Sequence, residues 1–401
     1  MIGNVLDHYD TALYGFLAPV IAPLFFPQHD YIVSLIMAYG LLSVGLITRP
    51  LGTIFFAHIA EKYTANRALS LSLLGIGFST GMIGMLPIYD TIGTFAPICL
   101  AVTRMLQGFF SSGETTVANV FLMAEAPEKH RGKINSIYQC SVMLGIIIAS
   151  LAATFIVSNQ QWHGYWRIPF LFGFISCIFG GLWRYYHAME KPVILKQVNR
   201  LNTILFNRKL KFLAAVLASS FTYLTYAIPF IFMNSFVPQI SSITLKEMMM
   251  ANSALLVLDM MILPIFGWLT DRYSPARVMQ CATISLAVTI VPAFALLSNA
   301  SLFMVCLVRI WIIILGLAFL APFSSWLYHQ FTEKKYLLTG FSYSLGTELF
   351  GRSSPIICLW LWHKTQNIIV PALFIAFISL LTAICILLVE RRSLKKALHA
   401  H

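Results

Sequence analysis

Ionisable side chains lie inside long apolar runs of this sequence, where a charge is costly. Asp7 and Asp10 are three residues apart in the first run, so they share one face of a helix, and His8 lies beside them. Neighbouring carboxylates in a low-dielectric environment are suited to taking up and releasing a proton. We therefore predict that Asp7, His8 and Asp10 are proton-binding candidates. The alternative is a hydrated, salt-bridged entrance, because these residues lie one or two turns from the start of the run.

A second group is centred on Arg104, in a later apolar run. Arginine receives a carboxylate through two hydrogen bonds, and Gln107 follows Arg104 by one turn. Both are predicted to bind a substrate, and Arg309 holds a corresponding position in the second part of the chain. Glu114, about three helical turns after Arg104, is a further proton-binding candidate. The alternative is an arginine that holds backbone carbonyls of a neighbouring helix.

Three further charges differ in whether a partner lies nearby in the sequence. Glu348 and Arg352 are four residues apart, and this spacing favours an internal ion pair. Asp259 has no such neighbour, so it is a better candidate for proton coupling than a paired acid. Arg309 or Arg352 can still reach it in three dimensions.

Tyrosines of two apolar runs offer a second kind of binding chemistry. Aromatic faces can hold a quaternary ammonium group through cation–π contacts. The candidates for binding such a solute are Tyr9, Tyr14, Tyr223 and Tyr226. The alternative is packing or lipid contact, since aromatic residues make up 14% of the chain.

The composition indicates what surrounds these residues. Of 401 residues, 58% are hydrophobic and only 10% are charged, too few charges to cover a water-facing surface. Because the apolar runs reach about 20 residues, we predict an all-α integral membrane protein in contact with the lipid bilayer. The formal net charge of +12 lies in short connectors, so no nucleic-acid partner is expected. The seven cysteines form no CxxC pair, and no metal site or cofactor is expected.

Twelve runs are expected to cross the membrane. Their approximate bounds are 5–26, 31–57, 68–88, 93–123, 134–157, 166–186, 212–236, 248–270, 278–297, 301–329, 336–361 and 367–389. Most of the 27 Lys and Arg residues fall after even-numbered spans or in the C-terminal tail. This asymmetry places both termini in the cytoplasm. We expect a monomer in a bacterial cytoplasmic (inner) membrane.

A long basic connector separates two similar halves. The predicted parts are a six-helix half, the connector, a second six-helix half and a basic tail, at residues 1–186, 187–211, 212–390 and 391–401. The segments AHIAEKYTANR at 57–67 and GWLTDRYSPAR at 267–277 have an acid, a base and a terminal Arg at matching offsets. Two parallel six-helix repeats are typical of alternating-access carriers.

The same two segments predict a gate on the cytoplasmic side. Acids and bases at helix ends can bind neighbouring helices in one conformation and release them in another. The gate candidates are Glu61, Arg67, Gly267, Asp271, Arg272 and Arg277. The alternative is that these charges only fix the orientation of the chain.

Five motifs follow one another along the first half. They are DHYDTALYG at 7–15, RPLG at 49–52, RMLQGFFSSGE at 104–114, EAPEKHRG at 125–132 and WRIPF at 166–170. This series resembles the major facilitator superfamily, and within it the metabolite:proton symporters that include proline/betaine transporters. The resemblance implies the twelve-helix major facilitator fold with two pseudo-symmetric halves, and a role for Arg104 in proton or substrate linkage. His8 departs from the usual Trp, and the 57–67 segment lacks the usual glycines.

These features predict a proton-coupled secondary active transporter rather than an enzyme. It would import a small zwitterionic or anionic organic solute, such as an osmolyte, amino acid or carboxylate, by alternating access. No GxxxxGK[ST] motif is present, so the proton gradient rather than ATP is the expected energy source. The alternatives are an efflux or exchange carrier of the same fold and a transport-incompetent membrane sensor.

Overall fold

The structure is a computed structural model that describes residues 2–125, 127, 130–158, 164–187, 209–331 and 335–398. Within these ranges the chain is helical and contains no strand. The predicted connector falls mostly outside them, since the description stops at 187 and resumes at 209.

All twelve predicted spans are helical. The first six correspond to α1 (Ile2–Phe25), α2 (Tyr31–Gly40) with α3 (Gly45–Lys62), α4 (Ala65–Met85), α6 (Phe95–Glu125), α7 (Arg131–Ser158) and α8 (Arg167–His187). The next three are α10 (Lys209–Ala227) with η3 (Ile228–Phe232) and α11 (Met233–Ile240), α12 (Leu245–Thr270), and α13 (Pro275–Ala295). The last three are α14 (Leu302–Gln330), α15 (Lys335–Gly346) with η4 (Thr347–Arg352) and α16 (Ser354–Thr365), and α17 (Ile369–Leu398). A short helix that was not predicted, α5 (Tyr89–Ile92), precedes α6.

Three spans that were predicted as continuous contain interruptions. The second breaks between Gly40 and Gly45, where two glycines flank a turn and weaken the helix. The seventh and eleventh contain the π-helical turns η3 and η4. Proline at the start of η3 cannot donate its backbone hydrogen bond, and η4 carries Glu348 and Arg352. Such π turns often accompany functional sites.

Nine helical segments of the described chain are long and apolar enough to cross a membrane by length and composition alone. The other three predicted spans lie in α1, α6 and α15–α16. They carry six charged residues: Asp7, Asp10, Arg104, Glu114, Glu348 and Arg352. On the outside, apolar side chains of α8 such as Phe172, Ile175 and Phe179 are more than half exposed, as expected for helices that contact lipid.

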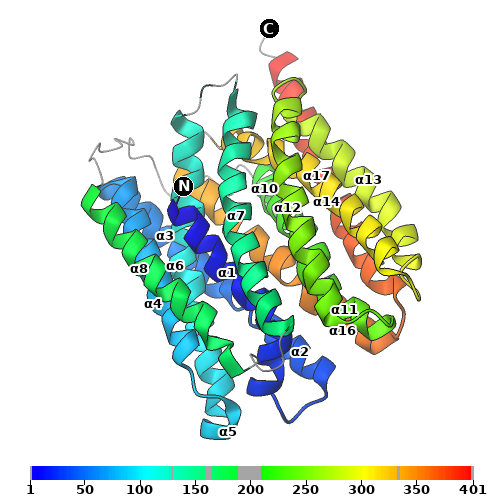
Figure 1. The fold of residues 1–401 in the computed structure, drawn as a ribbon. Coiled ribbons are helices and arrows are strands. Elements are labelled where there is room, and N and C mark those ends of the chain that lie inside the picture. The colour runs from blue at the N-terminus through cyan, green and yellow to red at the C-terminus, as the bar shows by residue number, and fades with distance from the viewer. Residues whose placement is uncertain are drawn as a thin grey trace.

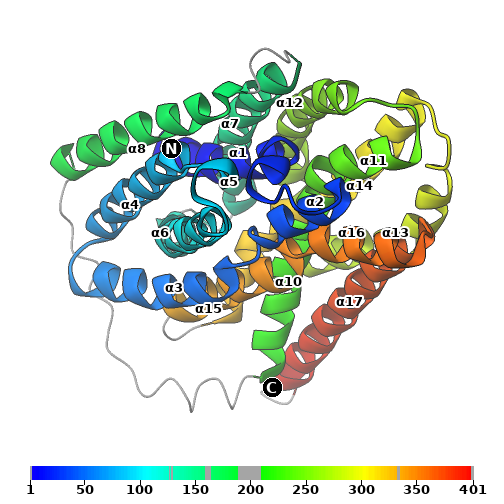
Figure 2. The same cartoon turned by 90° about the horizontal axis from the view of Figure 1, so that it is seen from below.

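The helices form two groups that meet along a central interface (Figures 1 and 2). In the first group α1 packs on α7, and α4 packs on α6 and α8; in the second α13 packs on α14 and α17, and α10 on α15 and η4. The groups touch mainly where α7 meets α12 and where α15 meets α3 and α6. Both termini lie toward the end of the bundle opposite α5 (Figure 1).

Equivalent close approaches recur in the two groups. Gly145 on α7 lies against the backbone carbonyl of Val5 on α1, and Gly346 on α15 lies against that of Val216 on α10. A Cβ atom at either glycine would overlap the carbonyl, so only glycine fits. Because these helices hold the fifth and first positions of their groups, the contacts are those of a repeat.

Candidate functional site

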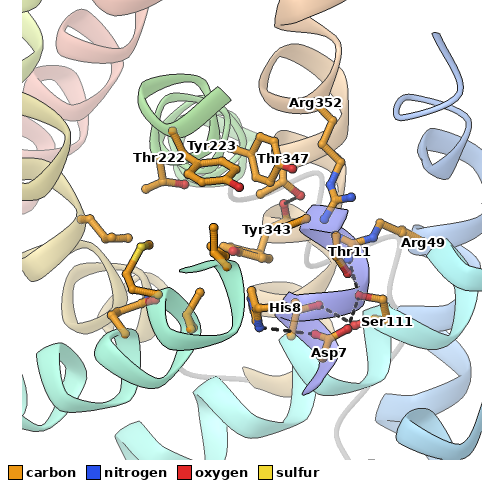
Figure 3. Close-up of a pocket in the computed structure, with 18 residues that line it drawn as sticks. Asp7, His8, Thr11, Arg49, Ser111, Thr222, Tyr223, Tyr343, Thr347 and Arg352 are labelled. Atoms are coloured by element: carbon orange, nitrogen blue, oxygen red, sulfur yellow. Dashed lines mark hydrogen bonds and ion pairs between the residues drawn. The ribbon is translucent and has the colours of Figure 1, made fainter. Parts of the chain in front are cut away.

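A cavity lies between the two groups of helices, with about 730 Å³ of empty space. Its walls come from α1, α3, α6 and α7 on one side and from α10, α14, α15 and η4 on the other. Figure 3 shows Asp7, His8 and Ser111 facing Tyr223 and Tyr343 across it.

A chain of polar contacts, here called the interface cluster, joins the two groups at this cavity. Asp7 accepts a hydrogen bond from Ser111 (2.9 Å), and Ser111 accepts one from Arg49 Nη2 (2.6 Å). Arg49 Nε lies 3.3 Å from Glu348 Oε1, and Arg352 Nε lies 3.0 Å from the same oxygen. The predicted Glu348–Arg352 pair is therefore present, but Glu348 also bridges to Arg49 on a helix of the other group.

His8 occupies the edge of the cavity next to Asp7. Its Nδ1 lies 2.9 Å from the Asn4 carbonyl and 3.7 Å from Asp7 Oδ2. A carbonyl can only accept, so Nδ1 carries a hydrogen in this contact. His8 therefore interacts with the interface cluster only at its margin.

A smaller space adjoins the interface cluster and brings in the predicted Arg104 and Gln107. Arg104 donates to Gln107 Oε1, and Gln107 donates to Thr80 on α4 (2.8 Å). The Arg104 guanidinium also lies 4.3 Å from the centroid of the Tyr14 ring. The side chains lining this space and the main cavity include three guanidinium groups, on Arg49, Arg104 and Arg352, and two carboxylates, on Asp7 and Glu348.

Arg309 repeats part of this arrangement in the second group. It is fully buried, donates to Asn252 Oδ1 on α12 and lies 6.0 Å from the centroid of the Phe230 ring. Arginine of the fourth span thus faces an aromatic ring of the first span in each group, a contact that the predicted correspondence of Arg104 and Arg309 did not include. Arg309 lines none of the cavities described here.

Asp259 lines a third space of about 290 Å³, between α10, α12 and α14. This space shares Thr222, Tyr226 and two other wall residues with the main cavity. The Asp259 side chain is 4% exposed, and its Oδ1 has no hydrogen-bond partner. Among the described residues, neither Arg309 nor Arg352 forms an ion pair with it.

Two predicted acids point away from all three spaces. Asp10 faces α8, where Cys177 Sγ lies 3.0 Å from its Oδ2. Glu114 forms a two-pronged ion pair with Arg184 on α8, at 2.8 and 3.1 Å. Arg184 lies within α8 and holds Glu114 inside the first group.

Two of the four predicted tyrosines line the main cavity, and the other two do not. Tyr223 and Tyr226 line the main cavity, and their rings are 5.4 Å apart. Tyr9 and Tyr14 are buried, and their hydroxyl groups donate to the carbonyls of Pro169 and Ala38 (2.8 and 2.9 Å). Only the α10 pair is therefore placed to touch a solute in this conformation.

The predicted gate segments lie at the end of the bundle that carries the termini. Asp271 accepts a hydrogen bond from the Lys133 backbone at the start of α7 (3.3 Å), which links the two groups. Arg272 stacks on Trp268, with 3.8 Å between guanidinium and ring centroid. Glu61, Arg67 and Arg277 are exposed, and Gly267 is buried in α12.

Sequence reasoning missed Arg49, Ser111, Tyr343 and Thr347 as cavity residues. Arg49 carried a usable signal, since it is an arginine inside an apolar run. The other three are polar residues of a kind that many membrane helices contain, and only their position at the interface distinguishes them. Within the described chain, no three His, Cys, Asp or Glu side chains are grouped to hold a metal ion.

Comparisons with known proteins agree with this architecture. Residues 1–237 match the family model of the Major Facilitator Superfamily. The chain is 26% identical to the Proline/betaine transporter of Escherichia coli (strain K12), over 99% of this chain and 84% of the relative. It is 27% identical to the Proline/betaine transporter of Salmonella typhimurium (strain LT2), with the same two coverages.

Solved structures share the fold at low sequence identity. The crystal structure of a D-xylose-proton symporter superimposes with a TM-score of 0.71 and 14% identity, covering 96% of this chain and 95% of that one. The transporter FucP in its outward conformation gives a TM-score of 0.66 and 14% identity, covering 96% and 97%. With more than half of its residues matched by the family model, the chain belongs to the Major Facilitator Superfamily.

Proposed function

We propose that this membrane transporter imports a small zwitterionic or anionic organic solute together with protons. The observation that carries the proposal is the interface cluster: buried charges from both groups of helices meet at a cavity between them. Relatives named proline/betaine transporters support a zwitterionic solute. A fold neighbour named a D-xylose-proton symporter supports coupling to protons. We place the protein in a bacterial cytoplasmic membrane with both termini inside.

The balance of charges supports a solute that carries a carboxylate. Three guanidinium groups and two carboxylates line the main cavity and its neighbour. With both acids ionised, one positive charge is left over, and a solute carboxylate near Arg49 and Arg352 balances it. Guanidinium groups bind carboxylates through paired hydrogen bonds.

Asp7 is the acid that we assign to proton binding. Asp7 lines the cavity and accepts a hydrogen bond from the Ser111 hydroxyl group. The Ser111 oxygen in turn accepts a hydrogen bond from Arg49. A proton on Asp7 leaves Arg49 with less negative charge nearby and so favours a solute carboxylate. By linkage, the carboxylate favours the proton equally. The two ions would thus be carried together.

Movement between conformations requires contacts that open on one side at a time. Thr53 on α3 bonds Ser344 on α15 at 2.7 Å, toward the end with the termini. Tyr39 on α2 bonds Ser235 on α11 toward the other end. Both links are closed here, and rocking of the two groups would break one while keeping the other.

Proteoliposomes provide the test. With acid outside, labelled proline and glycine betaine are offered, and uptake is recorded together with lumen pH. We expect accumulation with acidification of the lumen. Asp7→Asn should lose accumulation driven by the gradient and retain exchange of solute, while the exposed Glu247→Gln serves as the control.

Three outcomes would contradict the proposal in different parts. Accumulation by Asp7→Asn equal to that of the unchanged protein would remove Asp7 from coupling, and loss in Asp10→Asn instead would move the proton site to Asp10, on the side of α1 that faces α8. Solute movement only outward would favour an efflux carrier. Binding of solute without any accumulation under an imposed gradient would favour a sensor.

A further inference from the structure

We infer that Asp259 forms the subsite for the cationic group of a zwitterionic solute, a substituted ammonium. The inference rests on the proposed function and adds the orientation of the solute in the cavity. It starts from a buried acid that no described residue neutralises, in a space that shares four wall residues with the main cavity.

The surroundings of Asp259 leave its carboxyl group without a compensating charge. It is 4% exposed, its Oδ1 has no hydrogen-bond partner, and the described residues provide it with no ion pair. A buried charge without a partner is strongly unfavourable, so such a group is kept neutral or binds a charge from elsewhere. The space beside it, between α10, α12 and α14, is where such a charge would bind.

The nearby arginine does not fill this role. Arg309 also lies in the second group, but its hydrogen bond goes to Asn252, seven residues before Asp259 on α12. Seven residues span about 10 Å of helix, which separates the two sites. Arg352, the other candidate partner, binds Glu348 at 3.0 Å.

Aromatic side chains of α10 and η3 connect Asp259 with the interface cluster. The Arg352 guanidinium lies 4.8 Å from the Tyr223 ring centroid, Tyr223 is 5.4 Å from Tyr226, and Tyr226 is 5.5 Å from Phe230. Tyr226 and Phe230 both line the Asp259 space, and Tyr226 also lines the main cavity. The Tyr226 hydroxyl is buried and has no hydrogen-bond partner.

The main cavity and the Asp259 space together thus hold arginines at one end and an uncompensated acid at the other, with the rings of Tyr223, Tyr226 and Phe230 between them. A solute with a carboxylate and a substituted ammonium matches this order: the carboxylate binds near Arg49 and Arg352, and the ammonium binds near Asp259. Tyr226 and Phe230 supply cation–π contacts to the same group. A purely anionic solute would leave Asp259 unpaired.

Two probes separate this inference from the proposed function. Glycine betaine carries a trimethylammonium group, and 3,3-dimethylbutanoate has the same shape with carbon in place of the ammonium nitrogen. Equilibrium binding of both is measured by calorimetry on the purified full-length protein in detergent. We expect glycine betaine to bind about tenfold or more tightly than 3,3-dimethylbutanoate.

Variants then assign the preference to Asp259. Asp259→Asn should abolish it by weakening glycine betaine alone, and Asp259→Glu should retain part of it. Binding of 3,3-dimethylbutanoate by Asp259→Asn shows that the variant is folded. Arg352→Gln should weaken the binding of both probes alike, because both carry a carboxylate. Glu247→Gln, on the same helix as Asp259, should change the binding of neither probe.

Each remaining outcome overturns the inference. An unchanged preference in Asp259→Asn, or equal weakening of both probes, would show that Asp259 does not bind the ammonium, while the proposed function would stand. Equal binding of the two probes by the unchanged protein would also show that Asp259 does not bind the ammonium group. Failure of both probes to bind would contradict the proposed solute class, and with it this inference.

Discussion

The interface cluster and the Asp259 space differ in whether the buried charge has a partner of opposite charge. In the interface cluster, Glu348 is within 3.3 Å of two guanidinium nitrogens, one from each group of helices. Asp259 has no charged partner among the described residues, although it is almost as deeply buried. A charge that the protein compensates by itself can hold helices together, whereas an uncompensated charge is left to bind something that comes and goes.

The largest expected effect is loss of stability when the interface cluster is broken. Glu348→Gln leaves Arg49 and Arg352 buried close together without their shared counterion, so we expect a loss of about 3–5 kcal/mol in the free energy of unfolding. Chemical unfolding in detergent, followed by circular dichroism, measures it. A loss no greater than that of Glu247→Gln would show that the cluster does not hold the groups together.

A smaller loss is expected for an ion pair inside one group. Glu114→Gln removes the two-pronged contact with Arg184, whose side chain is 20% exposed and can turn toward water. We expect about 2 kcal/mol of lost stability and unchanged binding of glycine betaine. Unfolding and calorimetry on the same preparation test both points. Loss of binding would mean that Glu114 acts on the cavity after all.

Hydrogen bonds between uncharged residues of the two groups should contribute less to the free energy of unfolding and more to the equilibrium between conformations. Asn135 on α7 donates to the Ala321 carbonyl on α14 at 3.0 Å, toward the end with the termini. Ser150, about 22 Å further along α7, bonds Ser253 on α12. Losing either bond costs about 1 kcal/mol, enough to shift a conformational equilibrium about fivefold.

The two substitutions should shift that equilibrium in opposite directions. Asn135→Ala should favour opening at the end with the termini, and Ser150→Ala should favour opening at the other end. Labelling of single cysteines placed in the cavity, from each side of sealed vesicles, measures the direction. If both variants shifted the labelling in the same direction, the two hydrogen bonds would not act at opposite ends of the bundle.

The smallest effect on stability is expected at Asp259. Asp259→Asn removes a buried carboxylate that has no partner, so the free energy of unfolding should stay the same or increase slightly. The unfolding experiment used for Glu348→Gln measures it. A loss as large as that of Glu348→Gln would mean that Asp259 is compensated within the protein, and the contrast between the two regions would disappear.

Neighbours along one helix were predictable from the sequence, but their surroundings were not. Glu348 and Arg352 are four residues apart and do form a pair, since helical geometry alone brings them together. Asp7 and Asp10 were predicted to act together because they share a helix face. The structure separates their contacts: Asp7 turns to the cavity and Asp10 to Cys177, because α1 lies between the cavity and α8.

The sequence by itself determined the membrane class, the twelve helical spans and the twofold repeat, because hydropathy and helical spacing act over one or two dozen neighbouring residues. It also identified most of the buried charges that needed an explanation, although not Arg49 or Arg184. Only the tertiary structure decided which charges are compensated, since Arg49 meets Glu348 and Arg184 meets Glu114 across separations of 70 residues or more. Such pairings depend on how helices pack, and no local pattern in the chain encodes them.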